Sequence, residues 1–117
     1  MKEIVLDTET TGISVKEGHR IVEIGCIELN DLVPTKNKFH CYLNPERKVS
    51  EKALEVHGYT DEFLSTQKKF SEICEQFLDF INLIKNGSNV VVIKKENNNP
   101  KPALTVIYWN IFISRYV

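Results

Sequence analysis

Two acidic residues at the end of the first apolar stretch constrain the fold of this chain more than any other feature. The apolar residues 4–6 predict a buried strand over residues 3–8, and Gly12 provides a turn after it. Asp7 and Glu9 are two positions apart, so on a strand their side chains share one face, roughly 7 Å apart at the backbone. Such a carboxylate pair is a ready ligand set for a hard cation such as Mg²⁺. Taken alone, the pair is more often two solvated acids at a strand end.

Two further extended segments follow this first strand. Residues 20–29 are largely apolar, and residues 39–43 form a shorter stretch. Turn-forming residues lie between them, namely Asn30, Asp31 and Pro34. The three segments predict an antiparallel meander in which the first strand is central.

Helix signals begin after the third extended segment. Ser50 is placed to cap a short helix that runs through Val56, and Gly58 is placed to end it. Thr60, followed by two acids, predicts the start of a second helix. A third helix is predicted by apolar residues at helical spacing, which form a core-facing stripe. The stripe consists of Phe70, Ile73, Cys74, Phe77, Ile81 and Ile84.

The composition changes after Asn82. Seven of the ten asparagines lie from Asn82 onward, and no aspartate follows Asp79. We therefore divide the chain into residues 1–82, the N-terminal half of a domain, and residues 83–117, a divergent tail.

Within the tail, three segments differ in character. Residues 90–93 predict a strand, residues 94–102 a polar loop, and residues 104–113 another extended apolar run. An unfinished sheet edge at this last run would invite pairing with another chain.

Size and charge exclude several classes of protein. The 117 residues suit one domain, and the formal net charge of −1 argues against nucleic-acid binding carried chiefly by a basic surface. No apolar run approaches the ~20 residues of a membrane span, so we expect a soluble, cytoplasmic protein without a membrane partner. The three cysteines lack ligand spacing and indicate reduced thiols.

Residues 7–12, Asp-Thr-Glu-Thr-Thr-Gly, resemble the first motif of the DEDD, or DnaQ-like, exonuclease superfamily. Residues 18–25, 44–47 and 56–64 are similar to segments of the proofreading epsilon-subunit family of bacterial DNA polymerase III. The resemblance covers roughly residues 3–82. It implies an α/β, ribonuclease H-like exonuclease fold with a mixed sheet, incomplete at the C-terminal side.

The resemblance implies a two-metal site with Mg²⁺ or Mn²⁺ as cofactor. Asp7 would bridge the two metals, and Glu9 would ligate the metal that prepares the attacking water. Both residues are thus the expected catalytic and metal-binding residues.

The resemblance also implies contacts to the substrate. Thr10 and Thr11 would lie against the terminal nucleotide, and Val56 and His57 would help to wedge its base and sugar. Without the resemblance, His57 at a helix end before Gly58 would simply interact with terminal carbonyl groups.

Part of the ligand set that the resemblance implies is missing. The family uses four carboxylates plus a general base, and its middle Asn-x-x-Phe-Asp motif should follow residue 93. Residues 94–99 read Lys-Lys-Glu-Asn-Asn-Asn, where Glu96 is the sole acid, and no histidine follows His57. His19 and His40 have no supporting constellation and are interpreted as ordinary surface or core positions. We therefore do not expect robust activity from this chain alone.

Three functional hypotheses follow. The first is a 3′–5′ exonuclease that acts on DNA 3′ ends in replication proofreading, with the polymerase III catalytic subunit as a partner. In this hypothesis a frameshift truncates the product, and the missing motifs lie in another downstream reading frame. The second is a non-catalytic remnant or binding module that pairs with a partner chain. The third is an RNA-directed exonuclease of the same superfamily.

Overall fold

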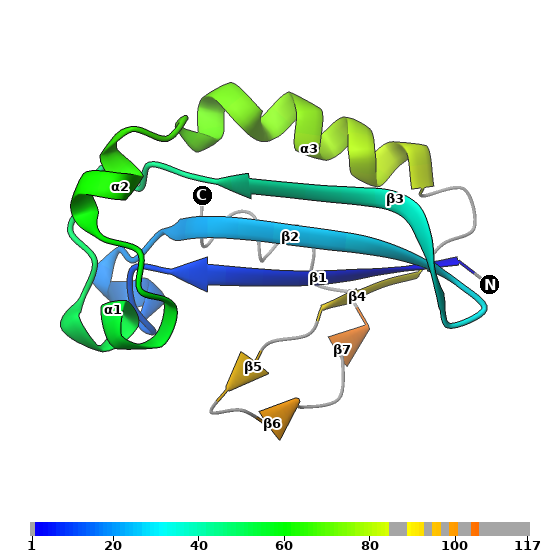
Figure 1. Ribbon diagram of the computed structural model, residues 1–117, viewed down its shortest axis with the longest axis horizontal. Helices are drawn as coiled ribbons and strands as arrows, with labels where there is room; N and C mark the ends of the chain where they lie inside the picture. Colours follow the sequence, from blue (N-terminus) through cyan, green and yellow to red (C-terminus); the bar gives the residue numbers. More distant parts are fainter. Residues whose placement is uncertain (1, 85–88, 93–94, 97–98, 101–103, 106–117) are drawn as a thin grey trace.

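The computed structural model describes residues 2–84, 89–92, 95–96, 99–100 and 104–105, with the side chains of residues 2–14 and 16–81. Its main sheet has the strand order β3-β2-β1-β4-β7 (Figure 1). The strands are β1 (Lys2–Thr10), β2 (Ile21–Asn30), β3 (Val33–Tyr42), β4 (Asn89–Val92) and β7 (Leu104–Thr105). β1 pairs antiparallel with β2 and parallel with β4, so the sheet is mixed.

The predicted meander with a central first strand is confirmed. β2 pairs antiparallel with both β1 and β3, and β1 occupies the middle of the five strands. β3 is longer than predicted, since it begins at Val33 and includes Pro34, which we expected in a turn. Asp31 and Leu32 make the turn instead, with φ angles of 49° and 67°. The first half of β3 is mostly exposed at the sheet edge, where proline is tolerated and apolar alternation is absent.

The three predicted helices are confirmed, with their caps. Helix α1 (Glu51–His57) begins after Ser50, whose Oγ accepts from the Ala53 amide, and ends at Gly58 with φ of 75°. Helix α2 (Asp61–Ser65) begins after Thr60, whose hydroxyl accepts from the Phe63 amide. Both helices lie at the end of the sheet where β1 stops, after the short 3-10 helix η1 (Val15–Glu17) (Figure 1).

Helix α3 (Phe70–Ile84) supplies the core-facing stripe that the sequence predicts. Ile73, Phe77 and Ile81 are buried against the sheet, while Phe70 packs at the edge of this cluster and Cys74 is half-buried. The side chain of Ile84 lies outside the described residues. The buried cluster consists of Ile4, Leu6, Ile21, Ile24, Cys26, Leu43, Ile73, Phe77 and Ile81. One face of the β1–β3 sheet is therefore filled by α3.

The tail is described in part. The predicted strand at residues 90–93 is observed as β4, with Ile93 outside the described residues. The loop predicted for residues 94–102 is wrong in part, because β5 (Lys95–Glu96) and β6 (Asn99–Pro100) pair in a separate sheet. Of the run at residues 104–113, Leu104 and Thr105 form β7, and the rest lies outside the described residues.

The helices described here include none with the length and apolar character needed to cross a bilayer.

Candidate metal and nucleotide site

The sheet face opposite α3 carries three rows of side chains that cross β1, β2 and β3. Residues directly opposite in antiparallel strands project from the same face, so the strand register defines each row. The rows are Val5, Ile27 and Lys38; Asp7, Gly25 and His40; and Glu9, Glu23 and Tyr42. Asp7 and Glu9 thus lie on one face in adjacent rows, in the arrangement that their spacing implies.

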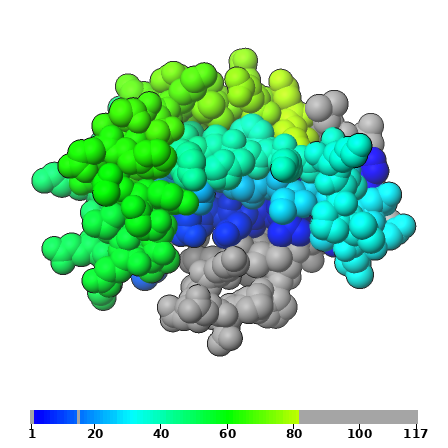
Figure 2. Space-filling view, in the orientation of Figure 1, coloured from blue at the N-terminus to red at the C-terminus, as the bar shows by residue number. Residues whose placement is uncertain are grey.

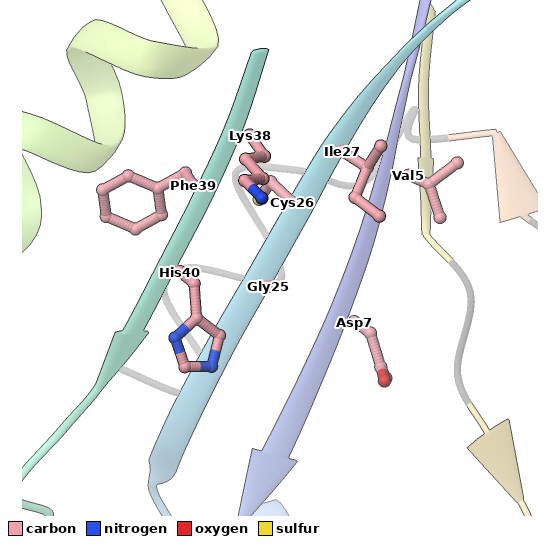
Figure 3. A pocket seen from close by; sticks show the side chains of 8 residues that line it. All are labelled: Val5, Asp7, Gly25, Cys26, Ile27, Lys38, Phe39 and His40. Atoms are coloured by element: carbon pink, nitrogen blue, oxygen red, sulfur yellow. The ribbon is translucent and has the colours of Figure 1, made fainter. Parts of the chain in front are cut away.

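A hollow lies beside Asp7 because Gly25 has no side chain. Its volume is about 290 Å³, and it is lined by residues of β1, β2 and β3, with Asp7 on one side and His40 on the other (Figure 3). A Cβ atom on Gly25 would meet nothing closer than His40 Cδ2 at 4.0 Å. Figure 2 shows β1, in blue, recessed between the green α1–α2 region and the cyan β2–β3 hairpin.

Two acids stand directly opposite each other in the next row. Glu9 of β1 pairs with Glu23 of β2, and like charges in such cross-strand pairs destabilise a sheet. The Glu23 carboxylate is 19% exposed and its Oε2 accepts hydrogen bonds from His40 Nε2 and the Tyr59 hydroxyl, both at 2.9 Å. With Asp7 one row away, this face concentrates negative charge, which favours a bound cation.

Asp7 and Glu9 fit a divalent metal in part. Both are half-buried carboxylates on one face, and their oxygens are the donors that Mg²⁺ and Mn²⁺ prefer. Within the described residues, however, no three His, Cys, Asp or Glu side chains are grouped so that they could hold a metal ion. Glu96, the acid nearest to the expected middle motif, lies in β5 of the separate sheet. Two protein ligands would leave most of the coordination shell to water or substrate.

The pairing of β1 with β2 shifts register between Glu9 and Thr10. Glu9 pairs with Glu23 but Thr10 pairs with Ile21, so Val22 is an extra residue in β2. Bulges of this kind occur next to active sites, where they redirect a side chain. Here the extra residue, Val22, lies opposite the end of β1, between the partners of Glu9 and Thr10.

Thr11 stabilises the corner of the chain after β1, where it forms hydrogen bonds with His19, Arg20 and Ser50. Its amide donates to Arg20 O at 2.8 Å, its carbonyl accepts from Ser50 N at 2.9 Å, and its Oγ1 accepts from Arg20 N at 3.0 Å. The Thr11 hydroxyl also lies 2.8 Å from His19 Nδ1. Thr11 is 0% exposed, so the expected direct contact with a nucleotide would require this corner to open.

His19 completes a Thr–His–Glu chain that resembles the relay of a nucleophilic hydrolase. Its Nε2 lies 3.2 Å from Glu17 Oε2 and donates to it, and its Nδ1 lies 2.8 Å from the Thr11 hydroxyl. Because Thr11 is fully buried, no substrate reaches its hydroxyl while this corner is closed, and there the hydrogen-bonded residues serve structure. His19 is thus a buried position with a defined hydrogen-bond role, more specific than the ordinary position we expected.

His57 connects the end of α1 to the end of β1. Its Nδ1 accepts from the Tyr59 amide at 3.0 Å, so Nε2 carries the proton and donates to the Thr10 carbonyl at 3.1 Å. Burial lowers the pKa of His57, against smaller opposing effects of Thr10 and Glu23. The partner of His57 is therefore a strand carbonyl beside Glu9.

Two apolar side chains near this corner face solvent. Val56 is 76% exposed at the end of α1, and Ile13 is 80% exposed just after Gly12. The Thr10 hydroxyl donates to the Gly12 carbonyl at 2.7 Å. An exposed valine is available to pack against the flat face of a base, as the sequence-based prediction for Val56 requires.

Comparison with known proteins decides the family. A family model described as "RNase_T: Exonuclease" matches residues 4–98, which is most of the chain. The chain belongs to the RNase T exonuclease family. The resemblance to DnaQ-like exonucleases is thereby confirmed, and the match continues past the composition change at Asn82.

The curated relatives of this RNase T family chain include subunits of DNA polymerase III. DNA polymerase III subunit epsilon of Rickettsia typhi is 49% identical over 81 residues, which cover 69% of this chain and 35% of the relative. The subunit of Escherichia coli K12 is 46% identical over 95 residues, which cover 78% of this chain and 37% of the relative. The chain thus spans about a third of the length of the curated relatives it matches.

Solved structures of other nucleases share the fold. The nuclease domain of 3′hExo, a DEDDh family member bound to rAMP, aligns with a TM-score of 0.62 at 19% identity, over 81% of this chain and 52% of that one. Cell-death related nuclease 4 aligns with a TM-score of 0.61 at 17% identity, over 84% and 36%. The expected ribonuclease H-like exonuclease fold is confirmed, and the chain holds part of it.

Proposed function

We propose that this chain carries one side of the active site of a 3′–5′ exonuclease that acts on DNA ends, as in replication proofreading. The observation that carries the proposal is the placement of Asp7 and Glu9 on one sheet face, beside the hollow at Gly25. The membership of this chain in the RNase T exonuclease family supports exonuclease chemistry. The two epsilon subunits, 46% and 49% identical, support DNA over RNA as the substrate.

In this proposal the two carboxylates hold Mg²⁺ or Mn²⁺. A bound divalent ion lowers the pKa of water and stabilises the charge that develops on a phosphodiester during cleavage. With two protein ligands we expect weak metal binding and slow turnover, because both depend on a full ligand set and a positioned base.

The remaining site residues have separate tasks. Val56 and His57 would contact the base and sugar of the terminal nucleotide, with Thr10 beside them at the end of β1. Thr11 is proposed to contact the nucleotide only after local opening, and in the closed corner it positions Thr10 and Gly12.

A metal-dependent exonuclease assay tests the proposal. We expect slow, Mn²⁺-supported shortening of a 5′-labelled DNA strand from its 3′ end, with Asp7→Asn and Glu9→Gln each abolishing it. Glu75→Gln, which changes an exposed acid on α3, is the matched control and should leave the rate unchanged. Activity that survives Asp7→Asn would contradict the proposal, and faster cleavage of a matched RNA strand would favour the RNA-directed alternative.

A second candidate function is binding without catalysis, by pairing with another chain. Among the described strands, β7 ends the sheet beyond β4 and pairs with it over two residue positions. The partner would be a second copy or, by analogy with the named relatives, the catalytic subunit of DNA polymerase III. Sedimentation over a range of concentrations tests self-pairing, and a strict monomer at high concentration would contradict it.

A further inference from the structure

We propose that Glu23 is a positioning residue that holds the Tyr59–His57 pair, and with it the end of α1, against the strand end that carries Glu9. This inference rests on the proposed function, because it concerns the same site. It adds a residue to the site that lies on β2, outside the motif that defines the metal ligands.

Glu23 joins three parts of the fold through one oxygen atom. Its Oε2 accepts from His40 of β3 and from the hydroxyl of Tyr59, which lies between α1 and α2. Hydrogen bonds to an ionised acceptor are stronger than those between neutral groups. Glu23 is also mostly buried, so water competes poorly for these two donors.

The contacts of Tyr59 lead back to the metal-binding strand. Its ring stacks on the ring of His57, with centroids 4.9 Å apart and an interplanar angle of 18°. The Tyr59 amide donates to His57 Nδ1, and His57 Nε2 donates to the Thr10 carbonyl. These contacts therefore link β1 to β2 through the end of α1 and Tyr59. Glu9 on β1 lies directly opposite Glu23 on β2, so both ends of this series of contacts lie at the same place in the sheet.

Neighbouring aromatic rings brace Tyr59 from the other side. Tyr42 contacts Tyr59 edge-to-face at a centroid distance of 5.1 Å, and Tyr42 and Phe63 lie 5.0 Å apart in the same kind of arrangement. Burial and the hydrogen bond to Glu23 raise the pKa of Tyr59, so its hydroxyl stays protonated and remains a donor. The Tyr59 hydroxyl therefore donates its proton to the Glu23 carboxylate.

The two donors to Glu23 provide a matched pair of variants. Tyr59→Phe removes the hydroxyl that leads to His57. His40→Ala removes the donor on β3, whose half-exposed ring packs edge-to-face on Tyr42. Glu23→Ala removes the acceptor for both. Circular dichroism would verify that each variant keeps its secondary structure.

The readouts are the ¹⁵N shifts of the His57 ring and the hydrogen-exchange protection of the residue 59 amide in the full chain. We expect Tyr59→Phe and Glu23→Ala each to lower this protection on the order of tenfold, the effect of losing about 1.4 kcal/mol, and to mix the His57 tautomers. Combining Glu23→Ala with Tyr59→Phe should add little to the effect of either single change, because both changes remove the same hydrogen bond. His40→Ala should leave both readouts as in the wild type.

Equal effects of Tyr59→Phe and His40→Ala, or no effect of Tyr59→Phe, would overturn the positioning role. These readouts need neither metal nor nucleic acid. A chain without exonuclease activity can therefore still confirm the role of Glu23, and a failed role for Glu23 leaves the test of Asp7 and Glu9 untouched.

Discussion

At the scale of single residues, the corner after β1 depends on close contact between Gly12 and His19. A Cβ atom at position 12 would lie 2.3 Å from the His19 ring. That ring is buried and hydrogen-bonded at both nitrogens, so it cannot move aside cheaply. Glycine is therefore required here by lack of space, in contrast to Gly58, whose φ of 75° calls for it on conformational grounds.

Gly12→Ala should lower the free energy of unfolding by about 1–3 kcal/mol, the usual cost of overpacking. Gly25→Ala is the matched control, since a Cβ there meets only ordinary van der Waals contact and should leave stability nearly unchanged. Urea unfolding followed by circular dichroism measures both. Equal stability of the two variants would show that His19 does not fill the space beside Gly12.

A second residue-scale prediction concerns Glu28, which is buried on the core face of β2 at 2% exposure. Its Oε1 accepts from Thr35 Oγ1 at 2.9 Å and Asn37 Nδ2 at 3.2 Å, while its Oε2 is buried without a partner. Thr35→Val should therefore cost about 1–3 kcal/mol of stability, because it removes one of two donors to a buried carboxylate.

Lys36→Ala, on the same hairpin but exposed, is the comparison for Thr35→Val and should change stability by less than about 0.5 kcal/mol. If Thr35→Val costs no more than this surface change, the hydrogen bond from Thr35 does not stabilise Glu28.

At the scale of secondary-structure elements, local caps explain the short helices, and non-local pairing explains the edge strand. Ser50, Gly58 and Thr60 act within one turn of their own helix, so the limits of α1 and α2 follow from the sequence. The start of β3 could not be predicted in this way, because an edge strand exposed on most positions has no apolar alternation. Its strand conformation comes from pairing with β2, a non-local interaction.

The contact between α1 and β1 predicts a pH dependence of stability. Burial lowers the folded-state pKa of His57, although Glu23 nearby opposes the shift. Between the folded pKa and the ordinary value of about 6.5, the unfolded chain binds more protons. The contribution of His57 to the free energy of unfolding is therefore unchanged above about 6.5 and falls as the pH drops through the folded pKa.

Urea titrations from about pH 8 to about pH 5 on wild type and His57→Gln would measure this effect. The difference in free energy of unfolding between wild type and His57→Gln should be constant above about pH 6.5. Below about pH 6.5 the wild type should lose stability relative to the variant. Parallel curves over the whole range would mean that burial does not hold His57 neutral in the folded protein.

At the scale of the whole molecule, the fold and the shared face of Asp7 and Glu9 could be predicted, and the residues around them could not. Asp7 and Glu9 share a strand, so their common face follows from spacing alone. Glu23 bonds to His40, 17 positions away, and to Tyr59, 36 positions away. The strand register brings His40 near Glu23, and the packing of the segment between α1 and α2 brings Tyr59 there. The burial of Thr11 likewise depends on segments far along the chain, as its bond to Ser50 shows.

The central claim, that Asp7 and Glu9 together hold a divalent ion, is tested most directly by Mn²⁺-induced broadening of backbone amide signals. We expect sub-stoichiometric Mn²⁺ to broaden the signals of β1 around these residues and of the facing part of β2 around Gly25. Asp7→Asn should remove this effect, whereas Asp79→Asn, which changes an exposed acid on α3, should preserve it. Broadening that is uniform over the surface, or that persists in Asp7→Asn, would contradict the claim.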